Sequence, residues 1–346
     1  MKNRKELILK EIVDGYIETG EPISSKMILE EYDLDYSSAT VRNDMHELEE
    51  EGYLKKPYTS GGRVPTIEGY RYFVSWLLEL SELSGEEQRA VVEAYEFEQQ
   101  NTERLLRNTA TLLANITGYT GFVLGPDLEE RQVKYFTLTQ LDETHLMAIL
   151  VTDIGLVENR VIESDRTITQ EELDRINPLL SDRLVGTQLK HLKELKDVDL
   201  NEEGWYDKLT RDSFLLIRNF LRERSERRLY LEGSLNILGN GREEEQDPEK
   251  LKKVFDYLNE RSLTRITESC KEKDSQITAI VGLDDGTIDS EDSELLPYSL
   301  IIKRLANCSS SLGILGPINM DYSKSFSTVQ YIGGRLDTLL TAGKKN

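Results

Sequence analysis

Residues 23–66 read ISSKMILEEYDLDYSSATVRNDMHELEEEGYLKKPYTSGGRVPT and contain the most informative pattern in the chain. Ser37 is suited to cap a helix, because its hydroxyl can accept a backbone N–H near Thr40. Val41, Met45 and Leu48 then recur at spacings of four and three residues, which places them on one helical face. The stretch therefore predicts a short helix, a turn and a second, amphipathic helix.

The other side of this second helix carries small and hydrogen-bonding side chains. Small residues in a first turn allow a helix to enter the major groove, and Arg and Asn pair bidentately with guanine and adenine. We expect base-edge contacts from Ser38, Ala39, Thr40, Arg42 and Asn43, with Ser37 beside them at the cap. The pattern predicts a DNA-reading helix.

A β-hairpin is expected directly after this helix. Residues 53–57 are typical of a short strand, and residues 59–62 (TSGG) of a turn. A helix-turn-helix followed by a hairpin is a winged helix. The residues expected to hold the DNA backbone and minor groove are Lys26, Tyr58, Thr59, Ser60 and Arg63, with Pro65 and Arg71 completing the candidate DNA contacts.

The charge distribution limits what kind of DNA-binding protein this is. The chain of 346 residues has a formal charge of −21, which argues against a general nucleic-acid coat. Residues 1–52 carry 6 Lys and Arg against 14 Asp and Glu, whereas residues 53–72 carry 4 against 1. Non-specific attraction to phosphates should be weak, so binding would depend on a local basic patch, present in two copies.

The rest of the chain predicts an α+β body with an insertion. Residues 75–100 are expected to connect the winged helix to the body, and the polarity around residues 96–103 suits a semi-independent connector. Four β-rich segments follow, which we expect to pair in one antiparallel sheet: 119–124, 133–141, 145–152 and 156–163. Helices return at 170–182 and from residue 205, and strands resume at 277–283, 299–305 and 311–315 before a terminal helix. A helical insertion with an apolar face suits a dimer contact.

Nothing in the sequence supports enzymatic chemistry. Cys270 and Cys308 form no disulfide or metal pattern, and the histidines (His46, His145 and His191) lack metal-ligand spacing. We therefore expect no enzyme activity, no cofactor and no metal. The N-terminus is not typical of a signal peptide and no run approaches 18 apolar residues, so a cytoplasmic protein without a membrane segment is expected.

Several motifs together resemble one known family, the heat-inducible transcription repressor HrcA. Residues 37–45 (SSATVRNDM) resemble its reading helix, and residues 59–66 (TSGGRVPT) with 69–72 (GYRY) resemble its wing and following helix. Residues 232–238, 315–317 and 320–322 match weaker motifs. The chain departs from the family at Ile318-Asn319, where Thr-Arg is usual, and at 281–285, where an Ile-Gly-Glu-Glu-Asn-like stretch is usual.

The resemblance implies a multidomain α+β protein. Its expected parts are a winged helix-turn-helix domain at 1–80, a helical linker at 81–104, a GAF-like domain at 105–170 and 245–346, and an inserted helical dimerisation segment at 171–244. It implies a homodimer that represses heat-shock chaperone operons at an inverted-repeat operator in double-stranded DNA. It also implies that heat and a GroEL-type chaperonin modulate this activity.

Two other functions stay open at this point. One is a metabolite-gated winged-helix regulator, in which the GAF-like sheet senses a small effector. The other is a chaperonin-binding thermosensor whose output is DNA binding. Ligand-induced stabilisation would reveal the first, and loss of operator binding on warming, restored by chaperonin, would indicate the second.

Overall fold

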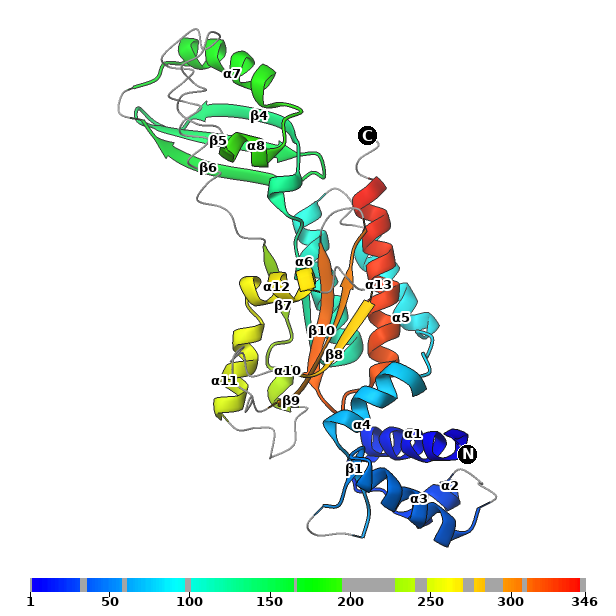
Figure 1. Cartoon of the computed structure of the whole chain (residues 1–346). Coiled ribbons are helices and arrows are strands. Elements are labelled where there is room, and N and C mark those ends of the chain that lie inside the picture. The colour runs from blue at the N-terminus through cyan, green and yellow to red at the C-terminus, as the bar shows by residue number, and fades with distance from the viewer. Residues whose placement is uncertain are drawn as a thin grey trace.

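The computed structural model describes residues 2–31, 36–57, 61–96, 101–164, 167–194, 228–239, 248–269, 277–283, 295–306 and 310–342. Predictions for Tyr58, Thr59 and Ser60, and for the helix starting at residue 205, lie outside these ranges. The described chain is a mixed α and β structure with several sheets, and it is elongated (Figure 1). The N-terminal unit lies at one end, a five-stranded sheet in the middle and a three-stranded sheet at the other end.

The N-terminal unit packs three helices and a small sheet around one core. Its elements are α1 (Lys2–Thr19), α2 (Ser25–Glu31), α3 (Ser38–Glu50), β1 (Leu54–Lys55), β2 (Val64–Pro65) and, leading out of the unit, α4 (Ile67–Tyr72). β1 and β2 are antiparallel, as the hairpin pattern predicts. Val41, Met45 and Leu48 are at most 3% exposed and pack with the apolar face of α1. The predicted inner face of α3 is therefore confirmed.

The segment after α4 packs on the rest of the protein where the structure describes it. It contains the π-helix η1 (Phe73–Leu77), α5 (Gly85–Glu96) and α6 (Thr102–Thr117). Val91 and Tyr95 of α5 are buried, and the Tyr95 hydroxyl lies 2.8 Å from that of Thr109 in α6. The charged residues of α5 occupy its outer face, while two apolar residues four positions apart face inward. The polar part of the predicted connector, around residues 96–103, falls partly outside the described ranges, so the connector stays a prediction.

The central unit is an antiparallel sheet in the order β7-β3-β10-β9-β8. Its strands are β3 (Thr120–Leu124), β7 (Leu229–Glu232), β8 (Ile277–Leu283), β9 (Leu296–Arg304) and β10 (Ser311–Pro317). β3 pairs with β10 far along the chain, so Gly121 lies opposite Ile314. The predicted return of the late strands to the early part of the body is confirmed.

Helices cover both faces of this sheet (Figure 1). α6 and α13 (Tyr322–Ala342) pack with one set of strand residues, which includes Val123, Ile301 and Ile314. The alternate residues, which include Leu300 and Ile302, pack on the other side with α11 (Pro248–Tyr257) and α12 (Glu260–Ser269); the short α10 (Asn236–Gly239) lies near them. Burial on both faces explains why these strands are almost continuously apolar.

The outer unit is a separate sheet of β4 (Val133–Gln140), β5 (His145–Thr152) and β6 (Val157–Glu163), in that order. It is accompanied by η2 (Leu128–Glu130), α7 (Gln170–Leu184) and α8 (Leu189–Glu194). The prediction that four consecutive strands form one sheet is wrong for β3, which belongs to the central sheet. Burial in the structure separates the two sheets: every residue of β3 is buried, whereas buried and more exposed residues alternate along β5, as expected of a strand with only one buried face.

The N-terminal unit and the central unit share one hydrophobic core. Tyr70 of α4 and Tyr322 at the start of α13 are 2% and 1% exposed, and their ring centroids lie 6.3 Å apart. Both belong to a cluster that runs from α1 and α3 to α13. We call this contact the joint; Tyr70, Arg71, Val281 and Tyr322 define it. Across the described ranges, no helix has the length and apolar character needed to cross a membrane.

Candidate nucleic-acid interface

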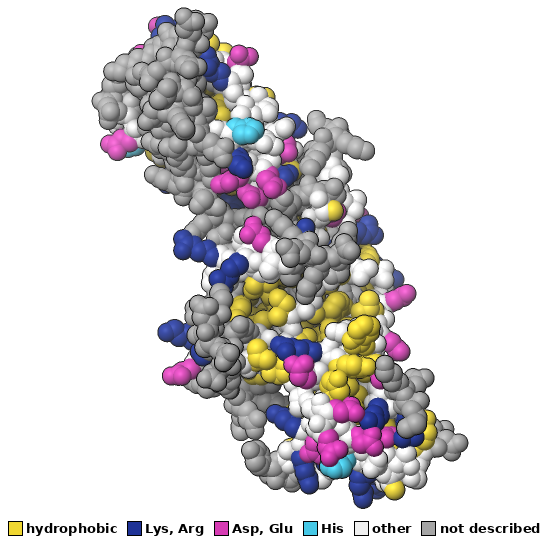
Figure 2. Space-filling model, viewed as in Figure 1, with side chains coloured by type: hydrophobic (Ala, Val, Ile, Leu, Met, Phe, Trp, Pro, Cys, Tyr) yellow, Lys and Arg dark blue, Asp and Glu magenta, His cyan; other side chains and the backbone are white. Residues whose placement is uncertain are grey.

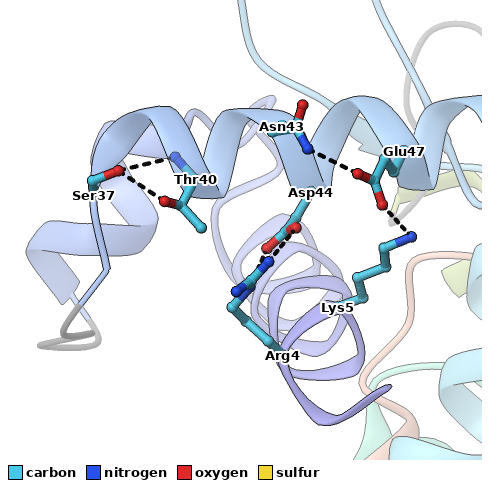
Figure 3. Close-up of polar contacts among 7 residues, drawn as sticks. All are labelled: Arg4, Lys5, Ser37, Thr40, Asn43, Asp44 and Glu47. Atoms are coloured by element: carbon cyan, nitrogen blue, oxygen red, sulfur yellow. Dashed lines mark hydrogen bonds and ion pairs between the residues drawn. The ribbon is translucent and has the colours of Figure 1, made fainter. Parts of the chain in front are cut away.

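α3 begins at the capped turn that the sequence predicts. The backbone of Ser37 is extended, and its hydroxyl accepts the backbone N–H of Thr40 at 3.1 Å. The hydroxyls of these two residues also lie 2.8 Å apart (Figure 3). Two of the predicted DNA contacts, Ser37 and Thr40, therefore also close the first turn of the helix.

The other predicted readers lie together on the outside of α3. Ser38, Ala39, Arg42 and Asn43 are all exposed, and we call these four residues the reading patch. The Asn43 side-chain amide donates to the carboxylate of Glu47 at 2.8 Å (Figure 3). Within the described residues, Arg42 makes no hydrogen bond or ion pair. Its guanidinium is thus available for a contact from outside.

Ion pairs connect the inner side of α3 to α1. The Arg4 guanidinium donates to both carboxylate oxygens of Asp44, at 2.5 and 2.9 Å, and the Asp44 side chain is only 2% exposed (Figure 3). The Lys5 ammonium lies 2.5 Å from Glu47 and 2.9 Å from Glu51. The sequence patterns described above did not predict these contacts. The available signal was the position of Asp44, three residues after Val41 and therefore on the apolar side of the helix.

These contacts reduce the repulsion expected between the acidic residues of α3 and DNA phosphates. The acidic end of α3 would repel phosphates, but Glu47 and Glu51 face Lys5, and Glu49 faces Arg63. The hydrogen bond between Lys5 and Glu47 raises the pKa of the lysine and lowers the pKa of the carboxyl, so both stay charged. Figure 2 shows basic and acidic side chains interspersed at this end of the molecule. The reading patch itself carries one charge, that of Arg42.

The residues predicted to form the wing are closely tied to the helices. The backbones of Ile23 and Arg63 form a two-way bridge at 3.0 and 2.8 Å, and the Arg63 guanidinium contacts Glu49 at 2.8 and 2.9 Å. Its side chain is 14% exposed, and Pro65 is buried. At Gly62, a Cβ would lie 2.8 Å from the Pro22 carbonyl oxygen, so the close approach requires glycine. A DNA contact by Arg63 or Pro65 stays a prediction.

The last two candidates differ sharply in their surroundings. Lys26 is 80% exposed, with its ammonium 3.4 Å from Glu30 one helical turn away. Arg71 instead lies at the joint, where its guanidinium donates to the Val281 carbonyl at 2.9 Å and pairs with Glu68 at 2.6 Å. Its predicted DNA contact is untested, and this geometry directs the side chain towards the central sheet.

The comparisons with known proteins agree with one another. The family described as HrcA protein C terminal domain matches residues 103–326. A protein of Pelotomaculum thermopropionicum named Heat-inducible transcription repressor HrcA is 33% identical over 98% of this chain and 97% of its own length. A protein of Halalkalibacterium halodurans with the same name is 32% identical over 99% of this chain and 98% of its own.

A solved structure supports the fold. A crystal structure described as a hypothetical protein superposes with a TM-score of 0.69, covers 98% of both chains and is 24% identical in sequence. At this level of identity the likeness speaks for the fold alone. It indicates that the arrangement of units along the chain also occurs in an experimentally determined protein.

Proposed function

The chain belongs to the HrcA family of heat-inducible transcription repressors, and from this premise we propose that it represses heat-shock chaperone operons by binding an inverted-repeat operator as a homodimer. The family is one of transcription repressors rather than of enzymes. The relatives compared above carry the repressor name, and they do not favour the metabolite-gated alternative.

The observation that carries the proposal is the division of α3 into two faces. Its inner side is buried against α1, while the reading patch is exposed at the N-terminal half of the helix. We assign residues 1–80 to a winged helix-turn-helix domain that reads base edges through Arg42 and Asn43. Lys26, Arg63 and the wing residues Tyr58, Thr59 and Ser60 would hold the sugar-phosphate backbone and the minor groove.

We further propose a GAF-like central domain with an inserted dimerisation segment. The five-stranded sheet and its helices are the GAF-like part. The separate three-stranded sheet favours an insertion that starts near residue 126 rather than at 171, because β4 to β6 pair only with one another. The insertion would end before β7, which pairs with β3.

The open face of the outer sheet supports the proposed dimer. Tyr135, Val157 and Val161 are 52%, 48% and 50% exposed, although all three are apolar. Val161 lies opposite Met147, and Val157 opposite Val151, so these side chains share one face. Exposed apolar patches of this kind mark association surfaces. A second copy of the chain would bury this face and bring two reading patches to the operator halves.

Heat and a GroEL-type chaperonin would act on the amount of repressor able to bind DNA. The test is a mobility-shift titration before and after warming, with and without chaperonin. Loss of operator binding on warming, followed by recovery with chaperonin, is the expected result. A repressor that keeps full binding after heating well above the growth temperature would contradict this part of the proposal.

Replacement of Arg42 by Ala tests the reading helix. Loss of a bidentate contact to a base should cost about 1–3 kcal/mol on the operator and relax one base position. Because Arg42 is exposed, the thermal midpoint should stay unchanged. The measurement is the ratio of dissociation constants for operator and scrambled duplex at fixed salt. An unchanged ratio would show that α3 does not read the sequence.

A further inference from the structure

A cavity of about 480 Å³ lies behind α3, between that helix, α1, the start of the hairpin and the end of α4. Its volume is within the range of small-molecule sites, roughly 300–1,000 Å³. Leu9 and Leu48, which are 1% and 3% exposed, provide an apolar floor. The rings of Tyr53 and Tyr72 line the cavity, with centroids 5.2 Å apart and planes tilted by 58°. These two leucines and two tyrosines form the apolar part of the lining.

The polar groups around this floor carry excess negative charge. Glu6, Glu47 and Glu51 line the cavity, and Lys5 is the one cation among its lining residues. Glu6 accepts a hydrogen bond from the Tyr72 hydroxyl at 2.8 Å, which fixes both side chains at the wall. Tyrosine faces attract cations through their quadrupole. Aromatic rings and a surplus of carboxylates both favour a positively charged guest.

Lys5 shows how such a guest would be held. Its ammonium lies between two carboxylates, 2.5 Å from Glu47 and 2.9 Å from Glu51, at the end of a flexible alkyl chain that is 29% exposed. A ligand ammonium could take the same place if the lysine side chain moved into solvent. We propose that this cavity, the α1–α3 cavity, binds a small organic amine whose apolar body packs on Tyr53, Tyr72 and Leu48 while its ammonium pairs with Glu51 and Glu47.

The cavity is connected to the reading patch through one side chain. Glu47 contacts Lys5 with one carboxylate oxygen and accepts the side-chain amide of Asn43 with the other, at 2.8 Å (Figure 3). An amine that replaces the Lys5 ammonium therefore changes the partner of the carboxylate that orients Asn43. Binding in the cavity does not depend on the proposed repressor function, whereas an effect on operator recognition does.

The test compares one charged and one neutral probe of the same shape, phenethylamine and phenethyl alcohol, by isothermal titration of the full-length protein. The amine should bind and the alcohol should not. Lys5→Met removes the competing ammonium and keeps the length of the side chain, so it should tighten amine binding about tenfold, which corresponds to about 1.4 kcal/mol. Lys10→Met is the matched control, because it removes the same charge from α1 at a residue that does not line the cavity.

A second variant, Glu51→Gln, tests the proposal even if Lys5→Met is unstable. Glu51→Gln removes a carboxylate whose side chain is 47% exposed, and it should weaken amine binding about tenfold. The Asn43 side-chain amide resonance should shift with amine and not with alcohol, in the absence of DNA. Equal binding of the two probes, or equal affinities of Lys5→Met and Lys10→Met for the amine, would overturn the proposal. Because no readout uses the operator, failure here leaves the repressor function to its own test.

Discussion

The reading patch and the N-terminal side of the joint, Tyr70 and Arg71, lie within the same 80 residues of the chain and are built in opposite ways. In the reading patch, side chains extend from a rigid helix into solvent, and Arg42 has no partner among the described residues. At the joint, Tyr70 is buried against Tyr322, and Arg71 is bonded to a main-chain carbonyl of the central sheet. Burial and existing partners, rather than residue type, therefore separate a side chain that is free to contact another molecule from one that packs the N-terminal unit on the central sheet.

Of the variants considered, removal of the Tyr70 ring should lower the free energy of unfolding the most. Tyr70→Ala would leave a cavity in the shared core and lower the free energy of unfolding by about 3–5 kcal/mol. Trp76→Ala is the control, since this nearby aromatic side chain is 77% exposed and its loss should change stability by about 0.5 kcal/mol or less. Urea denaturation of both variants measures the difference. If the two variants were equally stable, the joint would not be a packed contact.

Breaking the ion pair under the reading patch should have the next largest effect. Arg4→Met leaves the Asp44 carboxylate, which is only 2% exposed, without its partner, and we expect a loss of unfolding free energy that is smaller than that of Tyr70→Ala. The double variant Arg4→Met/Asp44→Leu removes both charges and should recover part of that loss. A thermodynamic cycle over the four proteins gives the coupling energy. A coupling energy near zero would mean that the ion pair between Arg4 and Asp44 does not stabilise the fold.

Arg71→Ala tests whether this side chain stabilises the fold or contacts DNA. A hydrogen bond from a charged group contributes about 1.5–3 kcal/mol to stability. Because the Arg71 side chain is 39% exposed, we expect its loss to lower the free energy of unfolding by less than this range. The operator-to-scrambled ratio should stay as in the original protein, in contrast to Arg42→Ala. Denaturation and mobility shift on the same samples provide both values. Weaker operator binding at unchanged stability would instead support the DNA contact predicted for Arg71.

Lys26→Met should have the smallest effect. The side chain is solvent-exposed, so stability should change by about 0.5 kcal/mol or less. A phosphate contact would be lost, and the slope of log affinity against log salt should fall by about 1 on every DNA sequence alike. Lys252→Met on the exposed surface of α11, outside the N-terminal unit, serves as the charge-matched control. Equal salt-dependence slopes for the two variants would show that Lys26 does not contact DNA phosphates.

Much of the candidate site could be predicted because its signals are local. The Ser37 cap, the apolar face of α3 and its polar outer face all follow from spacings within four residues. The strand segments were also found, but their grouping was not, since β3 pairs with a strand far along the chain. The identity of the partner of Asp44 was equally out of reach, because Arg4 lies 40 positions away.

Spacing and motifs alone predict that α3 has an inner and an outer face and that a hairpin follows, and they reveal the resemblance to a repressor family. These conclusions depend on periodicity and short motifs, which act over one or two helical turns. Two contacts became visible only in the folded protein: Arg71 bonds to Val281, 210 positions away, and Lys5 lines a cavity behind α3. The physical reason is that contacts between distant segments depend on how the packed surfaces meet, and no local spacing encodes that geometry.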